Sequence, residues 1–107
     1  MGLVLLRVEN NVLEGLPRSV EKMKELRGLF LSVNNIKEIN EEIGNLPSLE
    51  VLEIRQNHLK MLPEEVGRLF NLFKLDVGAN NLEYLPRSIG ELQALTDLDV
   101  SYNPQLS

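Results

Sequence analysis

Asparagine recurs along the whole chain at a fixed interval of 23 residues. The repeated residues are Asn11, Asn34, Asn57, Asn80 and Asn103. A fixed period of roughly 20–50 residues is typical of proteins built from stacked copies of one structural unit. Such stacks form extended surfaces rather than enclosed catalytic pockets. The period therefore predicts a repeat protein and favours binding over catalysis.

Aliphatic residues hold the same positions in nearly every unit. With each asparagine as position 0, leucine stands at −8 and −5 and a branched aliphatic residue or leucine at −3. Aliphatic residues or methionine also stand at +2, +5, +9 and +12, except in the fifth unit, where Pro104 and Gln105 follow the asparagine. Successive side chains of a strand point to opposite faces. Leu29 and Leu31 are therefore expected in a core, and Phe30 on the outer face.

These positions resemble those of a known repeat family. Residues 49–59 match every fixed position of the pattern L-x-x-L-x-L-x-x-N-x-L. Residues 62–67 and 85–90 resemble the L-P-x-x-I-G ending of the intracellular class, although Asn40 replaces the proline in the second unit. The chain thus resembles the leucine-rich repeats of Ras suppressor, Erbin and Scribble. The resemblance implies an α/β solenoid with a concave parallel sheet of about five strands and short helical or irregular convex segments.

The polar and special residues of the repeat have expected structural roles. The five asparagines are predicted to form a buried ladder, because an amide can both donate and accept hydrogen bonds where each strand turns away. The prolines are expected to begin the return segment with a fixed φ angle. The glycines that follow are expected to ease a tight turn.

The length and the ends of the chain predict one domain. A chain of 107 residues suits a single core. Leu3 follows Met1 almost at once and the chain stops at Ser107, soon after Asn103, so neither end resembles a polar cap. We expect residues 1–107 to be an excerpt of a longer array without its own caps. Ends that stack on another molecule, and an engineered array, are the alternatives.

Composition restricts the classes of partner. The net charge of −5 argues against nucleic acid, and the scattered bases argue against a membrane surface. No apolar run is long enough to span a bilayer. The chain has no cysteine and no N-x-S/T acceptor site, which favours a reducing, cytoplasmic compartment.

The sequence contains no recognisable catalytic motif. P-loop, G-x-G-x-x-G, nucleophile-elbow and H-E-x-x-H patterns are all missing. His58 is the single histidine, so a conventional zinc site is not expected. Asp97 and Asp99 share a strand face and are the one weak candidate for a cation. We therefore expect a non-enzyme without cofactor or metal.

The outward positions −6, −4, −2 and −1 vary between units, so the fold is not expected to fix them. On this concave face the predicted partner-binding residues are Arg7, Phe30, Ser32, Glu53, Arg55, Asp76, Asp99 and Tyr102. Phe30 is predicted to be an exposed aromatic anchor, of the kind that dominates interfaces. The acids gather towards the C-terminal end and are expected to steer a basic partner. Phe30→Asp is expected to abolish binding and leave the fold intact.

The leading functional hypothesis is a protein–protein interaction module. The resemblance implies a cytoplasmic scaffold or signalling protein whose partner is a small GTPase, a phosphatase or a polarity protein. Residues 95–103 are also similar to repeats found ahead of the GTPase and kinase domains of Roc-COR proteins. A second hypothesis is therefore that the module is part of such an enzyme. A third hypothesis is end-to-end self-association into filaments, because a contact between unlike ends does not close.

Overall fold

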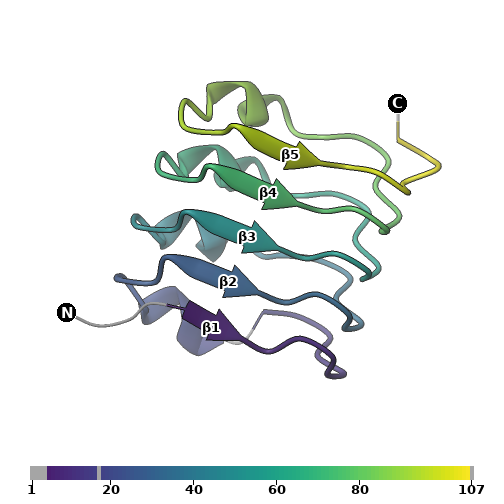
Figure 1. The fold of residues 1–107 in the computed structure, drawn as a ribbon, viewed down its shortest axis with the longest axis horizontal. Coiled ribbons are helices and arrows are strands. Elements are labelled where there is room, and N and C mark those ends of the chain that lie inside the picture. The colour runs from purple at the N-terminus through teal and green to yellow at the C-terminus, as the bar shows by residue number, and fades with distance from the viewer. Residues whose placement is uncertain (1–4, 17, 107) are drawn as a thin grey trace.

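The computed structural model describes residues 5–16 and 18–106, which form a stack of turns (Figure 1). Each turn contributes one short strand, and a 3-10 helix lies between successive strands. The strands are β1 (Leu5–Arg7), β2 (Gly28–Phe30), β3 (Val51–Glu53), β4 (Lys74–Asp76) and β5 (Asp97–Asp99). The helices are η1 (Arg18–Lys22), η2 (Glu41–Asn45), η3 (Glu64–Arg68) and η4 (Arg87–Glu91). Leu3 and Pro17, which belong to the repeat pattern, lie outside the described residues.

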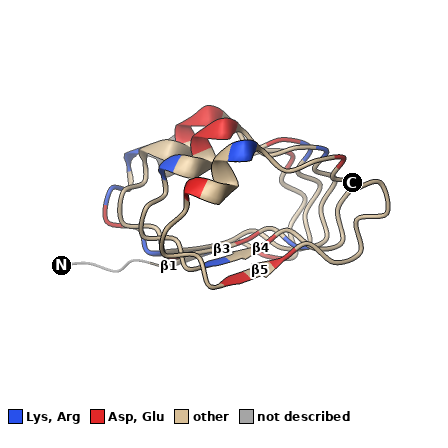
Figure 2. Ribbon diagram, turned by 90° about the horizontal axis from the view of Figure 1, so that it is seen from above, with Lys and Arg blue, Asp and Glu red and all other residues tan. Residues whose placement is uncertain are grey.

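The five strands form one parallel sheet in the order β1 to β5. Leu29 lies opposite Leu52, and Leu52 lies opposite Leu75, so each pairing advances by the 23-residue period. Side chains at one repeat position therefore form a continuous column across the sheet. The sheet lies on one side of the molecule and the helices on the other (Figure 2). The expected solenoid with a five-stranded parallel sheet is confirmed.

The hydrophobic core fills the space between the sheet and the helices. Leu29, Leu52 and Leu75 are completely buried, and Ile43 and Leu69 close the core from the helical side. Full burial of such a side chain contributes about 1.5–3 kcal/mol. The described units therefore share one continuous hydrophobic core.

The asparagine ladder is confirmed for the last four units. Its buried members are Asn34, Asn57, Asn80 and Asn103. The Oδ1 of Asn57 accepts the backbone N–H of Ile36 at 2.9 Å. Its Nδ2 donates to the carbonyl oxygens of Leu31 and Ile54 at 3.1 and 3.2 Å. Asn57 thus satisfies the buried N–H of Ile36 and shares the carbonyls of Leu31 and Ile54 with the amides of Asn34 and Asn80.

Asn11 departs from the predicted ladder, because its side chain is exposed. Its Nδ2 donates to the carbonyl oxygens of Val8 and Glu9, both at 3.0 Å and both in its own unit. Asn11 belongs to the outermost repeat of the described chain, where no earlier repeat covers it. The expectation of burial is therefore wrong at this position.

The residue before each ladder asparagine adopts the left-handed conformation, with φ between 54° and 59°. These residues are Asn10, Val33, Gln56, Ala79 and Tyr102. The N–H of Val33 donates to the carbonyl of Arg55 at 2.8 Å, and the N–H of Gln56 to that of Gly78 at 3.1 Å. The expectation that the fold leaves this column free is wrong for the backbone. Residue type varies here while the conformation does not.

Gly44 and Gly67 of the return segments allow close packing between successive helices, whereas a Cβ on Gly90 would meet no neighbouring atom within 4 Å. No glycine in the described residues has a positive φ angle, so the expected role is wrong. A Cβ on Gly67 would collide with the side chain of Ser88, and one on Gly44 would lie 2.9 Å from the carbonyl oxygen of Glu65. Ser88 Oγ donates to the carbonyl of Glu64 at 2.7 Å. Successive helices approach this closely only because a hydrogen replaces a side chain.

Asn40 takes the place of proline without altering the entry into its helix. Its φ and ψ angles are −80° and 168°, close to the −72° and 154° of Pro63. The helices that follow are each five residues long.

Among the described residues, no helix has the length and apolar character required to cross a membrane.

Candidate functional site

The concave face carries a network of charged side chains centred on Arg55. Its Nη1 lies 3.1 Å from Oδ1 of Asp76 and 3.2 Å from Oδ2 of Asp99. Its Nη2 lies 3.3 Å from Oγ of Ser101. Its Cζ lies 5.7 Å from the ring centroid of Tyr102, within the range of a cation–π contact. One guanidinium therefore joins side chains of three successive repeats.

Gly78 lies beneath the guanidinium and makes this reach possible. A Cβ at Gly78 would collide with Nη1 of Arg55 and would lie 3.0 Å from its Cζ. Gly78 was not among the predicted partner-binding residues. A usable signal was present, because Arg55 and Gly78 hold position −2 in adjacent units. When an arginine and a glycine are neighbours in one column, the long arginine side chain is expected to lie over the glycine and across the sheet.

Hydrogen bonds favour the ionised form of Asp99. The Oγ and N–H of Ser101 donate to Oδ1 of Asp99 at 2.6 and 2.9 Å. These bonds, and then the charge of Arg55, lower the pKa of Asp99 against the opposing effect of desolvation. Lys74 Nζ lies 3.2 Å from Oε2 of Glu53, and this hydrogen bond and charge raise the pKa of Lys74. These two shifts favour the charged forms of Asp99 and Lys74.

The acidic residues of this face form ion pairs within the sheet. Glu53, Asp76 and Asp99 are each paired with a lysine or arginine of a strand or strand end in the same sheet. The acids nevertheless outnumber their partners, because three carboxylates share two cations. Asp97 on β5 is exposed and adds a further negative charge, and Figure 2 shows acidic positions on this strand. The C-terminal half of the face therefore remains acidic.

Phe30 is not the exposed aromatic that was predicted. Only 8% of its surface is exposed, although it lies outside the aliphatic core. The guanidinium carbon of Arg7 lies 4.2 Å from its ring centroid. The ring itself lies over Gly28, where a Cβ would come within 2.8 Å of Cε2. Strand alternation predicted the correct face, but neighbouring side chains cover the ring, so Phe30 is not available as an anchor.

Ser32 and Tyr102 have different roles on this face. Ser32 Oγ accepts the backbone N–H of Arg55 at 2.9 Å, so its side chain helps to join two repeats. Tyr102 is 77% exposed and flanks the network. Tyr102 is therefore the aromatic side chain that a partner on this face would meet.

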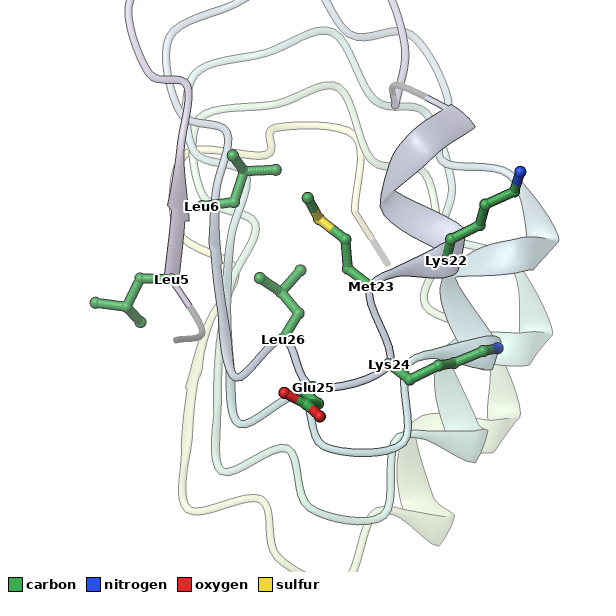
Figure 3. A pocket seen from close by; sticks show the side chains of 7 residues that line it. All are labelled: Leu5, Leu6, Lys22, Met23, Lys24, Glu25 and Leu26. Carbon is green, nitrogen blue, oxygen red and sulfur yellow. The ribbon is translucent and has the colours of Figure 1, made fainter. Parts of the chain in front are cut away.

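A hollow of about 370 Å³ opens at the first repeat, between β1 and the segment after η1. Leu6, Met23 and Leu26 point towards its interior, whereas Lys22 and Lys24 point away (Figure 3). Its inner lining consists of side chains from the core columns of the repeat. The hollow is thus the end of the hydrophobic core and not a polar ligand site.

The two aspartates of β5 do not form a metal site. Asp99 already binds Arg55 and Ser101. In residues 5–16 and 18–106, no group of three or more histidine or acidic side chains could hold a metal ion. The weak cation candidate at Asp97 and Asp99 therefore has no support from the geometry.

Comparison with known proteins identifies similar folds. The family described as a leucine-rich repeat region matches residues 3–105. A leucine-rich repeat protein of Leptospira interrogans is 36% identical, with a TM-score of 0.86 over 95% of this chain. The structure of PEPR1–AtPEP1 is 28% identical, with a TM-score of 0.84 over 94% of this chain. The plant peptide hormone receptor RGFR1, in complex with RGF2, is 35% identical, with a TM-score of 0.78 over 87%.

These proteins are much longer than the present chain. The chain spans 26% of the Leptospira protein, 15% of the PEPR1 chain and 16% of the RGFR1 chain. No curated protein matches it in sequence. The comparisons therefore concern the repeat region and not the other parts of those proteins.

Proposed function

Because the chain belongs to the leucine-rich repeat family, we propose that it is a non-catalytic module that binds a protein partner on its concave face. The bound segment is extended and carries a lysine or arginine. The observation that carries this proposal is the network of Arg55, Asp76 and Asp99, which holds charged groups in place before a partner arrives. Groups that are already ordered lose little side-chain freedom on binding.

The chemistry of the face favours a basic segment. Each carboxylate accepts several hydrogen bonds, so Asp76 and Asp99 retain acceptor capacity beyond their bonds to Arg55. Asp97 is exposed beside them, and the excess of acids attracts and orients a cation. Tyr102 offers a large ring at the edge of the same region, and tyrosine is enriched at binding hot spots.

Two of the similar structures support a peptide as the bound form. RGFR1 is described as a peptide hormone receptor in complex with RGF2, and PEPR1 was crystallised with AtPEP1. This chain corresponds to only about a sixth of either receptor. We therefore adopt from them the class of ligand, a peptide, and not its sequence.

Selection from a displayed library of random peptides tests the proposal. We expect the intact chain to enrich peptides that contain lysine or arginine. Tyr102→Ala should weaken the selected peptide about tenfold, as truncation of a hot-spot residue does. Asp99→Asn should weaken it more at low than at high salt, because salt screens exposed charges.

The matched control is Tyr84→Ala, which removes the other tyrosine of the chain, 47% exposed and outside the concave face. All variants must first show the same thermal melt. If Tyr84→Ala weakens binding as much as Tyr102→Ala, the concave face is not the site. If the selected peptides show no excess of basic residues, the proposed ligand chemistry is wrong.

The family resemblance supports a cellular setting for this activity. We place the module in a cytoplasmic scaffold or signalling protein, with a small GTPase, a phosphatase or a polarity protein as its partner. The alternative is a repeat segment of a Roc-COR-type GTPase or kinase. Capture from a lysate with the intact chain and Tyr102→Ala as parallel baits identifies the partner. A GTPase signature elsewhere in the parent gene would favour the alternative.

Self-association is a second candidate function, supported by Leu98. This residue is 39% exposed on β5, whereas Leu29, Leu52 and Leu75 in the same column are completely buried. Docking of β1 from a second copy onto β5 would cover Leu98, and repetition of this contact would build a filament. Sedimentation over a wide concentration range tests it, and a constant monomer mass would exclude it.

A further inference from the structure

The segment after each ladder asparagine forms an edge of the solenoid. Leu59, at position +2, is completely buried, while His58 and Lys60 on either side of it are exposed. Positions +1 and +3 of successive repeats therefore present their side chains together at this edge. The fold needs the aliphatic residue at +2 and leaves the residue types on either side free.

Four donor side chains from three successive repeats line one hollow of about 520 Å³ at this edge. They are Lys37, His58, Lys60 and Asn81. The two ammonium groups each offer three N–H donors, a neutral imidazole offers one, and the amide offers two. The amide oxygen and one imidazole nitrogen can also accept, but no carboxylate lines the hollow, so donors and positive charge predominate.

The two lysines form no ion pair within the part of the chain that the structure describes. Among the described residues, no carboxylate oxygen lies within 4.0 Å of either ammonium group. Lys37 and Lys60 hold position +3 in the second and third units, and Glu14 and Glu83 hold that position in the first and fourth units. Like charges side by side are unfavourable. On a chain whose net charge is −5, this pair is an arrangement that the fold does not require.

We propose that this hollow binds the phosphoryl group of a phosphorylated side chain on a protein partner. A phosphomonoester carries about −1.5 to −2 charges and three acceptor oxygens at neutral pH. Two lysines match that charge, whereas a single carboxylate would leave one lysine uncompensated. Lysine binds phosphate as a point charge, and the N–H groups of His58 and Asn81 can supply directional bonds. The hollow also has room for the side chain that carries the phosphoryl group.

This site shares no residue with the network around Arg55. The inference therefore does not rest on the proposed concave-face function, and either can fail alone. A partner that uses both would place a phosphorylated residue at the edge and a basic residue on the sheet.

Amide chemical shifts of the labelled chain provide the test. The probes are short alanine-based peptides that contain phosphoserine, phosphothreonine or phosphotyrosine, together with their unphosphorylated and glutamate counterparts and inorganic phosphate, all at one ionic strength. We expect saturable shifts at Lys37, His58, Lys60 and Asn81 with at least one phosphopeptide and much smaller shifts with its counterparts. Lys37→Gln and Lys60→Gln should each weaken that binding about tenfold, because each removes one of two charged partners.

The control is Lys22→Gln, which removes an exposed lysine of η1 from another part of the surface. The exposed positions of Lys37 and Lys60 allow all three variants to fold, which equal melting temperatures would verify. Equal shifts with phosphopeptide and glutamate peptide would overturn the proposal. So would an equal loss of affinity in Lys22→Gln. Inorganic phosphate that binds as tightly as every phosphopeptide would also overturn it, because the site would then recognise the free ion.

Discussion

The guanidinium of Arg7 lies 4.2 Å from the ring centroid of Phe30, and the two residues are register partners in β1 and β2. This contact, together with the position of the ring over Gly28, leaves only 8% of Phe30 exposed. Phe30 therefore contributes to the stability of the fold, although it lies on the concave face. Substitution of Phe30 tests packing first and partner binding only indirectly.

Phe30→Ala should lower the free energy of unfolding by roughly 3 kcal/mol, the lower end for truncation of a buried phenylalanine. Phe30→Asp should lower it further, because a carboxylate would replace the covered ring. Urea denaturation of both variants measures the effect. Phe70→Ala is the control: its ring is 64% exposed, so the change should stay within about 0.5 kcal/mol. Equal losses at Phe30 and Phe70 would contradict the burial of Phe30.

The hydrogen bonds of the ladder predict that loss of an asparagine amide lowers the free energy of unfolding much more in the middle of the stack than in its first unit. Asn57→Leu leaves the buried N–H of Ile36 unpaired, whereas the carbonyls of Leu31 and Ile54 each lose one of two amide donors and keep the other. Each buried group left unpaired costs about 1–3 kcal/mol. Asn11→Leu removes bonds at an exposed position, where water replaces them, and should cost less than about 1 kcal/mol. Denaturant titrations that give equal losses would refute this distinction.

The repeat frame explains why the fold could be predicted from sequence. Leu29, Leu52 and Leu75 recur with the period that the strand register requires, so core and register follow from the same pattern. The roles of the asparagines follow from amide chemistry in the same way. The return-segment glycines could not be read correctly, because contact between Gly67 and Ser88 depends on how closely two helices stack.

The concave site was less predictable because long side chains interact between columns. Arg55 reaches Asp99 two repeats away, and no periodic pattern records the length or direction of that reach. The contact of Arg7 with the ring of Phe30 could partly be predicted, since Arg7 precedes Phe30 by one period in the same column. The left-handed conformation at position −1 could not be predicted, because Val33 and Tyr102 share no backbone preference.

Val33 is strained by that conformation, and its replacement should stabilise the chain. A φ of 59° is unfavourable for a β-branched residue, whereas asparagine tolerates it. Val33→Asn keeps the backbone bond to the carbonyl of Arg55 and should raise the free energy of unfolding by about 1 kcal/mol. Val12→Asn is the control, since Val12 is 78% exposed and does not have a positive φ. A similar gain in both thermal melts would attribute the effect to surface polarity and not to backbone strain.

Ser101 should control the titration of Asp99. Ser101→Ala removes the 2.6 Å bond from Oγ and keeps the backbone N–H bond, so the pKa of Asp99 should rise part of the way towards its ordinary value. Because the folded-state pKa is lowered, the stability from this group is complete above the unfolded value of about 3.9. It is lost as pH falls through the lower, folded-state pKa.

The variant should therefore lose less stability than the parent as pH falls below about 4, since its folded and unfolded pKa values lie closer together. The carboxyl carbon shift of Asp99 gives the pKa directly, and thermal melts across the same pH range give the stability. Thr96→Ala is the control, because Thr96 Oγ1 bonds to the carbonyl of Phe73 and not to Asp99. An unchanged pKa in Ser101→Ala, or an equal rise in Thr96→Ala, would show that the hydroxyl of Ser101 does not hold Asp99 in its charged form.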